Sequence, residues 1–192
     1  MSRYLAGAFA LFLALPAMAE SPSYNFVSLG YQSVDLDASG GIDVDGDGWA
    51  LGGSFEIGEN MFGFVSYADT GFDFDIDLTQ IQAGLGWQTD VSEATNFFAR
   101  AAYVKAEIDA PLFGSEDESG YGLGIGVRSN VTDLIELYAE IAYADFGGGA
   151  DSTAIAGGIF FNLTEDFALG LGASADDDVT SFGVNARYYF GN

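Results

Sequence analysis

The residues that could carry chemistry in this 192-residue chain are almost all carboxylates. There are 29 Asp and Glu residues against 5 Lys and Arg, and there is no His and no Cys. Without His or Cys, the chain cannot form a Ser-His catalytic arrangement, a thiolate nucleophile, a disulfide or a Cys-ligated zinc site. Paired carboxylates could still act as acid and base, but no acidic pair stands apart from a solvated loop. We therefore expect no enzymatic activity.

One acidic segment, Asp43-Val-Asp45-Gly-Asp47-Gly48, resembles the start of a calcium-binding loop. Such a loop places oxygen ligands at alternate positions before a Gly and ends on a bidentate acid at its twelfth position. Ser54 occupies that position here, so the motif is incomplete. Calcium binding by Asp43, Asp45 and Asp47 is one hypothesis, and a solvated Asp/Gly hairpin loop is the other. We expect no other cofactor.

The formal net charge of −24 indicates which partners the chain avoids. Nucleic acid is excluded as a partner, because phosphate binding depends on Lys and Arg side chains. The mean hydropathy is nevertheless +0.20. A chain that is both acidic and apolar must segregate its charged residues from its apolar residues along the sequence.

The first 19 residues have the pattern of a secretory signal peptide. Arg3 precedes an apolar run over residues 4–15, and Ala17-Met18-Ala19 precedes the acidic Glu20. A basic residue, a short apolar run and small residues before the cut are typical of cleaved signal peptides. An uncleaved anchor is the alternative, but the run is short for a membrane span. We expect residues 1–19 to be removed and residues 20–192 to form one domain.

The rest of the chain alternates with a period of two residues, as strands with two different faces do. Similar aromatic segments recur at residues 26–31, 62–67, 98–103 and 138–143, with a second set of segments between them. A repeat at a fixed period defines the architecture, and each period here holds two strands and two connections. The pattern predicts an all-β chain with ten strands, near residues 24–33, 48–57, 61–68, 79–88, 96–105, 120–128, 135–144, 153–162, 167–175 and 180–190.

The two faces of these strands differ in composition. One face carries Leu, Val, Ile, Trp and Tyr, and the other is rich in Gly, Ala, Ser, Asn and Gln. A soluble barrel hides its apolar face and a membrane barrel exposes it. The polar face has too few charges for a solvated surface, and the aromatic residues fall into two bands, as at the two interfaces of a bilayer. These features predict a closed antiparallel up-and-down transmembrane β-barrel, which leaves no unpaired strand edge in lipid.

The polar face, which a membrane barrel turns inward, carries six charged residues within the strands. They are Glu56, Arg100, Arg128, Glu136, Glu140 and Arg187. Unpaired charges in a narrow lumen would be costly. We therefore predict a salt-bridge network that plugs or narrows the lumen, with Arg100 nearest to Glu136 or Glu140. The alternative is that these residues line a small conducting path.

The final strand carries a resemblance to a known family. Apolar residues alternate through Phe182-Gly-Val184-Asn-Ala186-Arg-Tyr188-Tyr-Phe190, and only Gly191 and Asn192 follow. This strand resembles the last strand of the small outer-membrane β-barrel proteins, a group that includes OmpX, the OmpA transmembrane domain and opacity-like porins. The resemblance implies a bacterial outer-membrane location, periplasmic termini, and recognition of Tyr188 and Phe190 by the barrel-assembly machinery. Many members have eight strands, which is the alternative to ten.

Acidic residues concentrate in the predicted connections at one end of the barrel. Residues 34–47, 69–77, 106–119, 145–152 and 176–178 hold about two thirds of them, and such a rim should concentrate cations. We expect a non-enzymatic outer-membrane protein with a structural or surface role, whose rim contacts either lipopolysaccharide through bridging divalent cations or extracellular partners. The alternatives are a narrow, weakly cation-selective porin for small solutes, and an acidic rim that only reflects a saline habitat. A closed barrel needs no partner for stability, so we expect a monomer.

Overall fold

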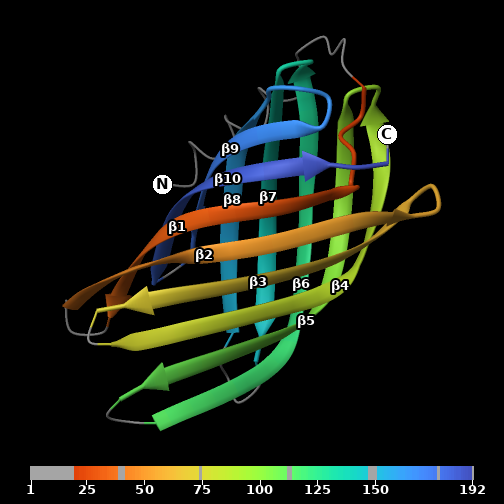
Figure 1. Cartoon of the computed structure of the whole chain (residues 1–192). Helices are drawn as coiled ribbons and strands as arrows, with labels where there is room; N and C mark the ends of the chain where they lie inside the picture. The colour runs from red at the N-terminus through yellow and green to blue at the C-terminus, as the bar shows by residue number, and fades with distance from the viewer. Residues whose placement is uncertain are drawn as a thin grey trace, which may run out of the picture.

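The computed structural model describes residues 20–38, 42–73, 75–111, 114–146, 151–176 and 178–191. These residues form a closed barrel in which β1 pairs with β10 (Figure 1). No helix among them is long and apolar enough to cross a membrane. The ten strands are β1 (Phe26–Ala38), β2 (Ile42–Ile57), β3 (Met61–Phe72), β4 (Ile76–Ser92), β5 (Thr95–Ala110), β6 (Gly114–Thr132), β7 (Ile135–Asp145), β8 (Asp151–Asn162), β9 (Phe167–Ala175) and β10 (Val179–Tyr189).

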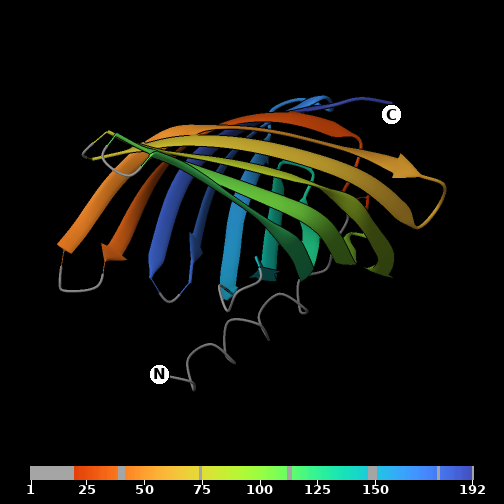
Figure 2. The ribbon, with the colours of Figure 1, turned by 90° about the horizontal axis from the view of Figure 1, so that it is seen from below.

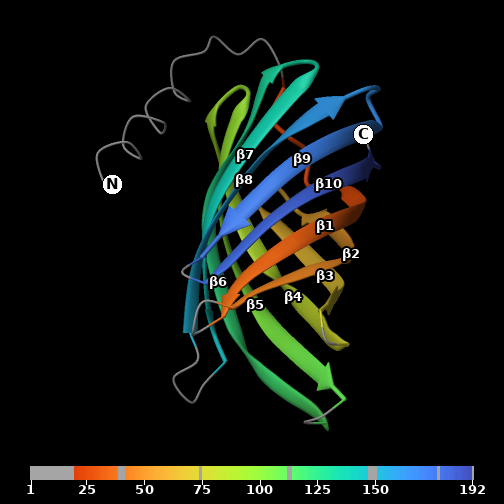
Figure 3. The same ribbon diagram turned by 90° about the vertical axis from the view of Figure 1, so that its left-hand side faces the viewer.

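Every strand pairs antiparallel with its neighbours in sequence, and the β1–β10 ladder from Phe26↔Tyr189 to Leu36↔Val179 closes the sheet. The views from below and from the side show the strands wrapping around one interior (Figures 2 and 3). The closed up-and-down barrel and the number of ten strands, rather than eight, are confirmed. We call the end of the barrel that holds Tyr24 and Phe190 the terminal end, and the opposite end the hairpin end.

Three strand pairs extend further than the sequence predicted. The β1–β2, β3–β4 and β5–β6 hairpins include most of residues 34–47, 69–77 and 106–119, which were expected to be loops. The β5–β6 hairpin projects beyond the others, away from the C-terminus (Figures 1 and 3). Asp and Gly are poor strand formers, but strand preference yields to pairing and packing. Here the ladder continues unbroken, with Asp35 opposite Asp45 and Asp77 opposite Asp109.

The outward face is apolar over the middle of the barrel. Trp49 is 58% exposed, and Leu51, Val65, Leu85 and Leu123 are exposed to a similar degree. Outward-facing aromatic residues form two bands around this region. The band toward the hairpin end contains Tyr31, Trp49, Tyr67, Tyr103 and Tyr121, and the band toward the terminal end contains Phe55, Trp87, Phe167, Tyr188 and Phe190.

The polarity of the outward face reverses beyond the first aromatic band. Along β1 the outward side changes from Val27 and Tyr31 to Asp35, while the inward Val34 is buried. The same change occurs on β3, where Asp69 follows Tyr67 on one face. Acids outward and apolar residues inward are the pattern of a strand in water. The barrel wall therefore continues past its apolar belt.

Candidate functional site

The lumen near the terminal end holds a buried charge cluster, formed by Arg128, Glu136, Arg187 and Tyr189. Glu136 is 1% exposed. Arg128 donates two hydrogen bonds to it, from Nε to Oε1 at 2.9 Å and from Nη2 to Oε2 at 3.0 Å. Arg187 Nη1 donates to Oε1 at 3.2 Å and the Tyr189 hydroxyl to Oε2 at 3.0 Å. One carboxylate thus holds two guanidinium groups from β6 and β10 across the lumen.

Aromatic rings surround the charge cluster. The Arg187 guanidinium carbon lies 3.8 Å from the centre of the Phe160 ring and 4.2 Å from that of Phe26. The Arg128 guanidinium lies 4.6 Å from the centre of the Tyr24 ring. A guanidinium over an aromatic face is favourable, more so when water is excluded. The rings and the four polar groups pack together across this half of the lumen.

A second ion pair lies nearer to the hairpin end. Arg100 Nε donates to Glu140 Oε1 at 2.5 Å, as the prediction for Arg100 anticipated. This pair is more open than the charge cluster, because 29% of the Arg100 side chain is exposed. Arg100 lines two cavities of about 310 and 160 Å³ in this half of the lumen. The hairpin half is therefore only partly filled.

Glu56 does not join either ion pair, contrary to the sequence prediction. It lies near the end of β2, where its side chain is exposed. Its carboxylate accepts hydrogen bonds from the Tyr24 backbone N–H and the Asn25 side-chain amide, both at 3.1 Å. Residues that precede β1 therefore supply the hydrogen-bond donors of the Glu56 carboxylate. The periodicity of the sequence does not indicate that these residues lie beside the end of β2.

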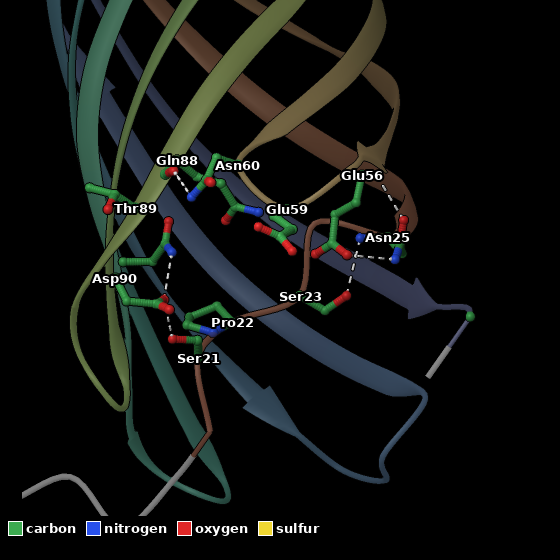
Figure 4. A pocket seen from close by; sticks show the side chains of 12 residues that line it. Ser21, Pro22, Ser23, Asn25, Glu56, Glu59, Asn60, Gln88, Thr89 and Asp90 are labelled. Atoms are coloured by element: carbon green, nitrogen blue, oxygen red, sulfur yellow. Dashed lines mark hydrogen bonds between the residues drawn. The ribbon is translucent and has the colours of Figure 1, made fainter.

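Those residues form the N-terminal segment, residues 20–24, which crosses the terminal end of the lumen. Ser21 donates to Asp90 on β4 at 2.6 Å, and the Arg128 guanidinium donates to the Ser23 carbonyl oxygen at 2.8 Å. Figure 4 shows Ser21 beside Asp90, and Ser23 and Asn25 near Glu56. The segment is thus tied to strands on more than one side of the barrel.

Tyr24 is the main anchor of this segment. The side chain is 3% exposed and stacks on Phe62 with 4.4 Å between ring centres. Burial raises the pKa of Tyr24 to about 12, so the hydroxyl stays protonated and donates to Asn96 Oδ1 at 2.9 Å. The alternation in the sequence predicts a first strand that includes Tyr24, but β1 begins at Phe26. Tyr24 turns into the lumen instead.

An acidic band follows the tyrosines at the hairpin end. The hydroxyls of Tyr31, Tyr67 and Tyr121 donate to the carboxylates of Asp47, Asp69 and Asp145, at 2.6, 2.9 and 3.1 Å respectively. Several acids also face each other across neighbouring strands, which is destabilising unless cations or hydrogen bonds compensate. We define the acidic band as Asp35, Asp45, Asp47, Asp69, Asp77, Glu107, Asp109, Asp117, Asp145 and Asp151.

The segment that resembled a calcium loop is part of β2 rather than a turn. Asp45 lies opposite Asp35, and Asp47 accepts the Tyr31 hydroxyl. An extended strand spaces alternate residues along a line, so it does not wrap an ion as a calcium loop does. Among the residues with described side chains, no three acids gather at one metal position, and the Asp43 side chain lies outside those residues. Calcium binding here stays a prediction.

The two residues of the expected assembly signal lie at the β1–β10 seam. Tyr188 is exposed on the outer face, and Phe190, just after β10, is also exposed. The Phe190 backbone N–H donates to the Asn25 carbonyl oxygen at 3.0 Å. Both rings are therefore accessible on the outer surface of the strand that closes the barrel.

Comparison with known proteins assigns the chain to a family. The model of the outer membrane protein beta-barrel domain matches residues 5–190. The chain belongs to this family. The apolar belt is accordingly the surface that faces lipid in the outer membrane. No curated protein matches the chain significantly.

The chain is also similar to solved structures of other proteins. An outer membrane channel from Pseudomonas putida F1 has a TM-score of 0.58 at 9% identity, over 91% of this chain and 99% of the other. The KdgM porin in complex with oligogalacturonate has a TM-score of 0.50 at 10% identity, over 85% and 99%. Neisserial surface protein A has a TM-score of 0.47 at 19% identity, over 88% and 98%.

Proposed function

We propose that this outer-membrane barrel is a non-enzymatic structural or surface protein whose acidic band contacts lipopolysaccharide through bridging divalent cations. The hairpin end lies on the extracellular side of the membrane, and both termini lie in the periplasm. The observation that carries the proposal is the position of the acidic band, directly beyond the aromatic residues that mark the bilayer interface. At that level the carboxylates meet lipid phosphates, and only a shared cation makes the contact favourable.

The arrangement of the carboxylates supports divalent rather than monovalent cations. Asp77 lies directly opposite Asp109, and Asp145 directly opposite Asp151. Directly opposite side chains on one face of an antiparallel pair are about 5 Å apart at Cβ, a spacing at which two carboxylates and a phosphate can share one hard cation. The only base in this region of the described chain is Lys105, which already pairs with Glu107 and Asp117.

The test is thermal unfolding of refolded protein in bilayers with and without lipopolysaccharide. We expect Mg²⁺ or Ca²⁺ to raise the melting temperature strongly only when lipopolysaccharide is present. The variant Asp77→Asn/Asp109→Asn should lose part of that increase, whereas the matched change Asp90→Asn at the terminal end should not. An equal response to Mg²⁺ without lipopolysaccharide, or none at all, would contradict the proposal. The same titration with Ca²⁺ alone tests Asp43, Asp45 and Asp47.

A second candidate is a narrow, weakly cation-selective porin. The cavities beside Arg100 favour it, because they leave about 310 and 160 Å³ in the hairpin half of the lumen. The buried charge cluster, which joins β6, β7 and β10 across the lumen, favours the structural role. Planar-bilayer recording separates the two, since a porin gives discrete conductance steps in the unmodified protein.

A further inference from the structure

The N-terminal segment crosses the terminal opening of the barrel. It precedes β1, but Arg128 and Asn130 on β6 hold its backbone, by hydrogen bonds of 2.8 Å to the carbonyl oxygens of Ser23 and Glu20. In the closed order of ten strands, β6 is five strands away from β1 in either direction. The segment therefore runs from one wall to the opposite wall. Pro22 and Tyr24, along its path, are both buried.

The segment is attached in a way that allows its release. Each of its bonds to the wall involves at least one side chain. The wall contributes the side chains of Glu56, Asp90, Asn96, Arg128 and Asn130, and the Glu93 carbonyl oxygen accepts from the Ser21 hydroxyl. In the described chain, no backbone–backbone hydrogen bond joins residues 20–24 to the barrel. The strand ladders are complete without it, and the seam bond to Phe190 is made by Asn25. Displacing residues 20–24 would thus leave the barrel closed on itself.

Open volume lies on both sides of the segment. Toward the terminal end, Ser21, Pro22 and Ser23 line cavities of about 300 and 490 Å³. Toward the hairpin end, the Tyr24 ring contacts Phe62, Phe62 contacts Phe64, and the Phe64 ring lies under Arg100. Arg100 lines the cavities of the hairpin half. Tyr24 is the part of this stack that the segment, rather than the barrel wall, contributes.

We propose that the barrel is a latent pore for small cations, closed at the terminal end by its own N-terminal segment, with Tyr24 as the stopper. Displacing the segment opens the lumen on the side of Phe62 and Phe98. Acids surround both ends of that path. The acidic band lies on the outer face of the wall around the hairpin end, and Glu56, Glu59 and Asp90 line a cavity at the terminal end. Mouths of one charge sign concentrate ions of the opposite sign, so the open state favours cations.

The experiment compares single-channel recordings in KCl of the protein that comprises residues 20–192 with recordings of two variants in which the segment is removed or weakened. One variant lacks residues 20–24, and the other is Tyr24→Ala. Each should raise the open probability about tenfold or more, since one net hydrogen bond already shifts an equilibrium about fivefold. Tyr103→Ala is the matched control, because it removes an equally large side chain from the outer face. A salt gradient should give a reversal potential of cationic sign.

A cross-link supplies the opposite perturbation. The chain has no Cys, so Ser21→Cys/Asp90→Cys introduces the only thiols, at side chains that already meet. Its oxidised form should stay silent even at voltages that open the unmodified protein, and reduction should restore those openings. This arm decides the question if the deletion variant does not fold, as judged by heat-modifiable gel mobility.

Two outcomes would overturn the latent pore. Folded variants without residues 20–24 or the Tyr24 ring that stay silent would show that the charge cluster alone closes the lumen. An unmodified protein that already conducts as the deletion variant does would show that the segment closes nothing. Neither result bears on the cation-dependent contact with lipopolysaccharide, which is measured by melting temperature.

Discussion

Replacing Glu136 with Gln tests how much the charge cluster contributes to stability. Gln keeps the shape of the side chain but leaves two buried guanidinium groups without a counter-charge, and its amide can accept at one atom only. The carboxylate accepts four hydrogen bonds from Arg128, Arg187 and Tyr189. Removing one partner of a buried ion pair costs about 3–5 kcal/mol. The unfolding equilibrium should therefore shift by about two to four orders of magnitude.

Urea titration in detergent micelles, followed by Trp fluorescence, measures this change. Both Trp residues, Trp49 and Trp87, lie on the outer face and report loss of the apolar surroundings. Glu140→Gln is the matched control, because its partner Arg100 is partly exposed, and it should cost only about 1 kcal/mol. If the midpoints for Glu136→Gln and Glu140→Gln coincide, burial does not determine the strength of these pairs and the reasoning fails.

Three further changes test the belt, the wall and the seam. Leu51→Arg, in the apolar belt, should cost about 2–4 kcal/mol in bilayers; a neutral result in refolding titrations would contradict a lipid-facing side chain. Gly84→Ala should lower the unfolding midpoint because its Cβ meets the Ala101 carbonyl oxygen, whereas Gly71→Ala, with ordinary contacts only, should not; equal midpoints would count against this packing. Phe190→Ala should reduce assembled protein in cells while refolding in detergent is unchanged, and a parallel loss in both assays would assign Phe190 a folding role instead.

The fold could be predicted from the sequence because, in a lipid-facing barrel, apolar residues alternate with small or polar residues in every strand. The alternation of Leu29 and Tyr31 with Gly30 and Gln32 identifies the faces of β1, and equivalent patterns recur in each strand. The ends of the hairpins could not be predicted in the same way. Beyond the aromatic band the solvent changes from lipid to water, so the outward residues become Asp and the pattern reads as a loop. The period of two nevertheless continues through Val34, Asp35 and Leu36.

The partners of the ion pairs depend on the height of each charge in the lumen as well as on the face of the strand. The alternation of residues along the strands places all six charged residues on one face, and the equal number of positive and negative charges indicates pairing. The alternation does not give the position of each residue along the barrel axis, which depends on the stagger between strands. Arg128 and Arg187 reach Glu136 from β6 and β10, while Glu56 lies too near the end of β2 to meet them. Tyr189 could have been found, because it alternates with the outward Tyr188.

The N-terminal segment has no signature in the sequence, for a physical reason. Its partners Asn96 and Arg128 are 72 and 105 residues away from the groups that they bind, and nothing periodic connects them. Tyr24 alone looks like a strand residue, since Tyr is a common strand former. What distinguishes it is the space left between Phe62, Phe98 and Arg128, which exists only when the barrel has closed. If the side chains of the strands filled the lumen completely, there would be no space for a ring from the N-terminal segment. A buried Tyr supplied by a segment outside the ladder indicates that the wall by itself leaves a gap.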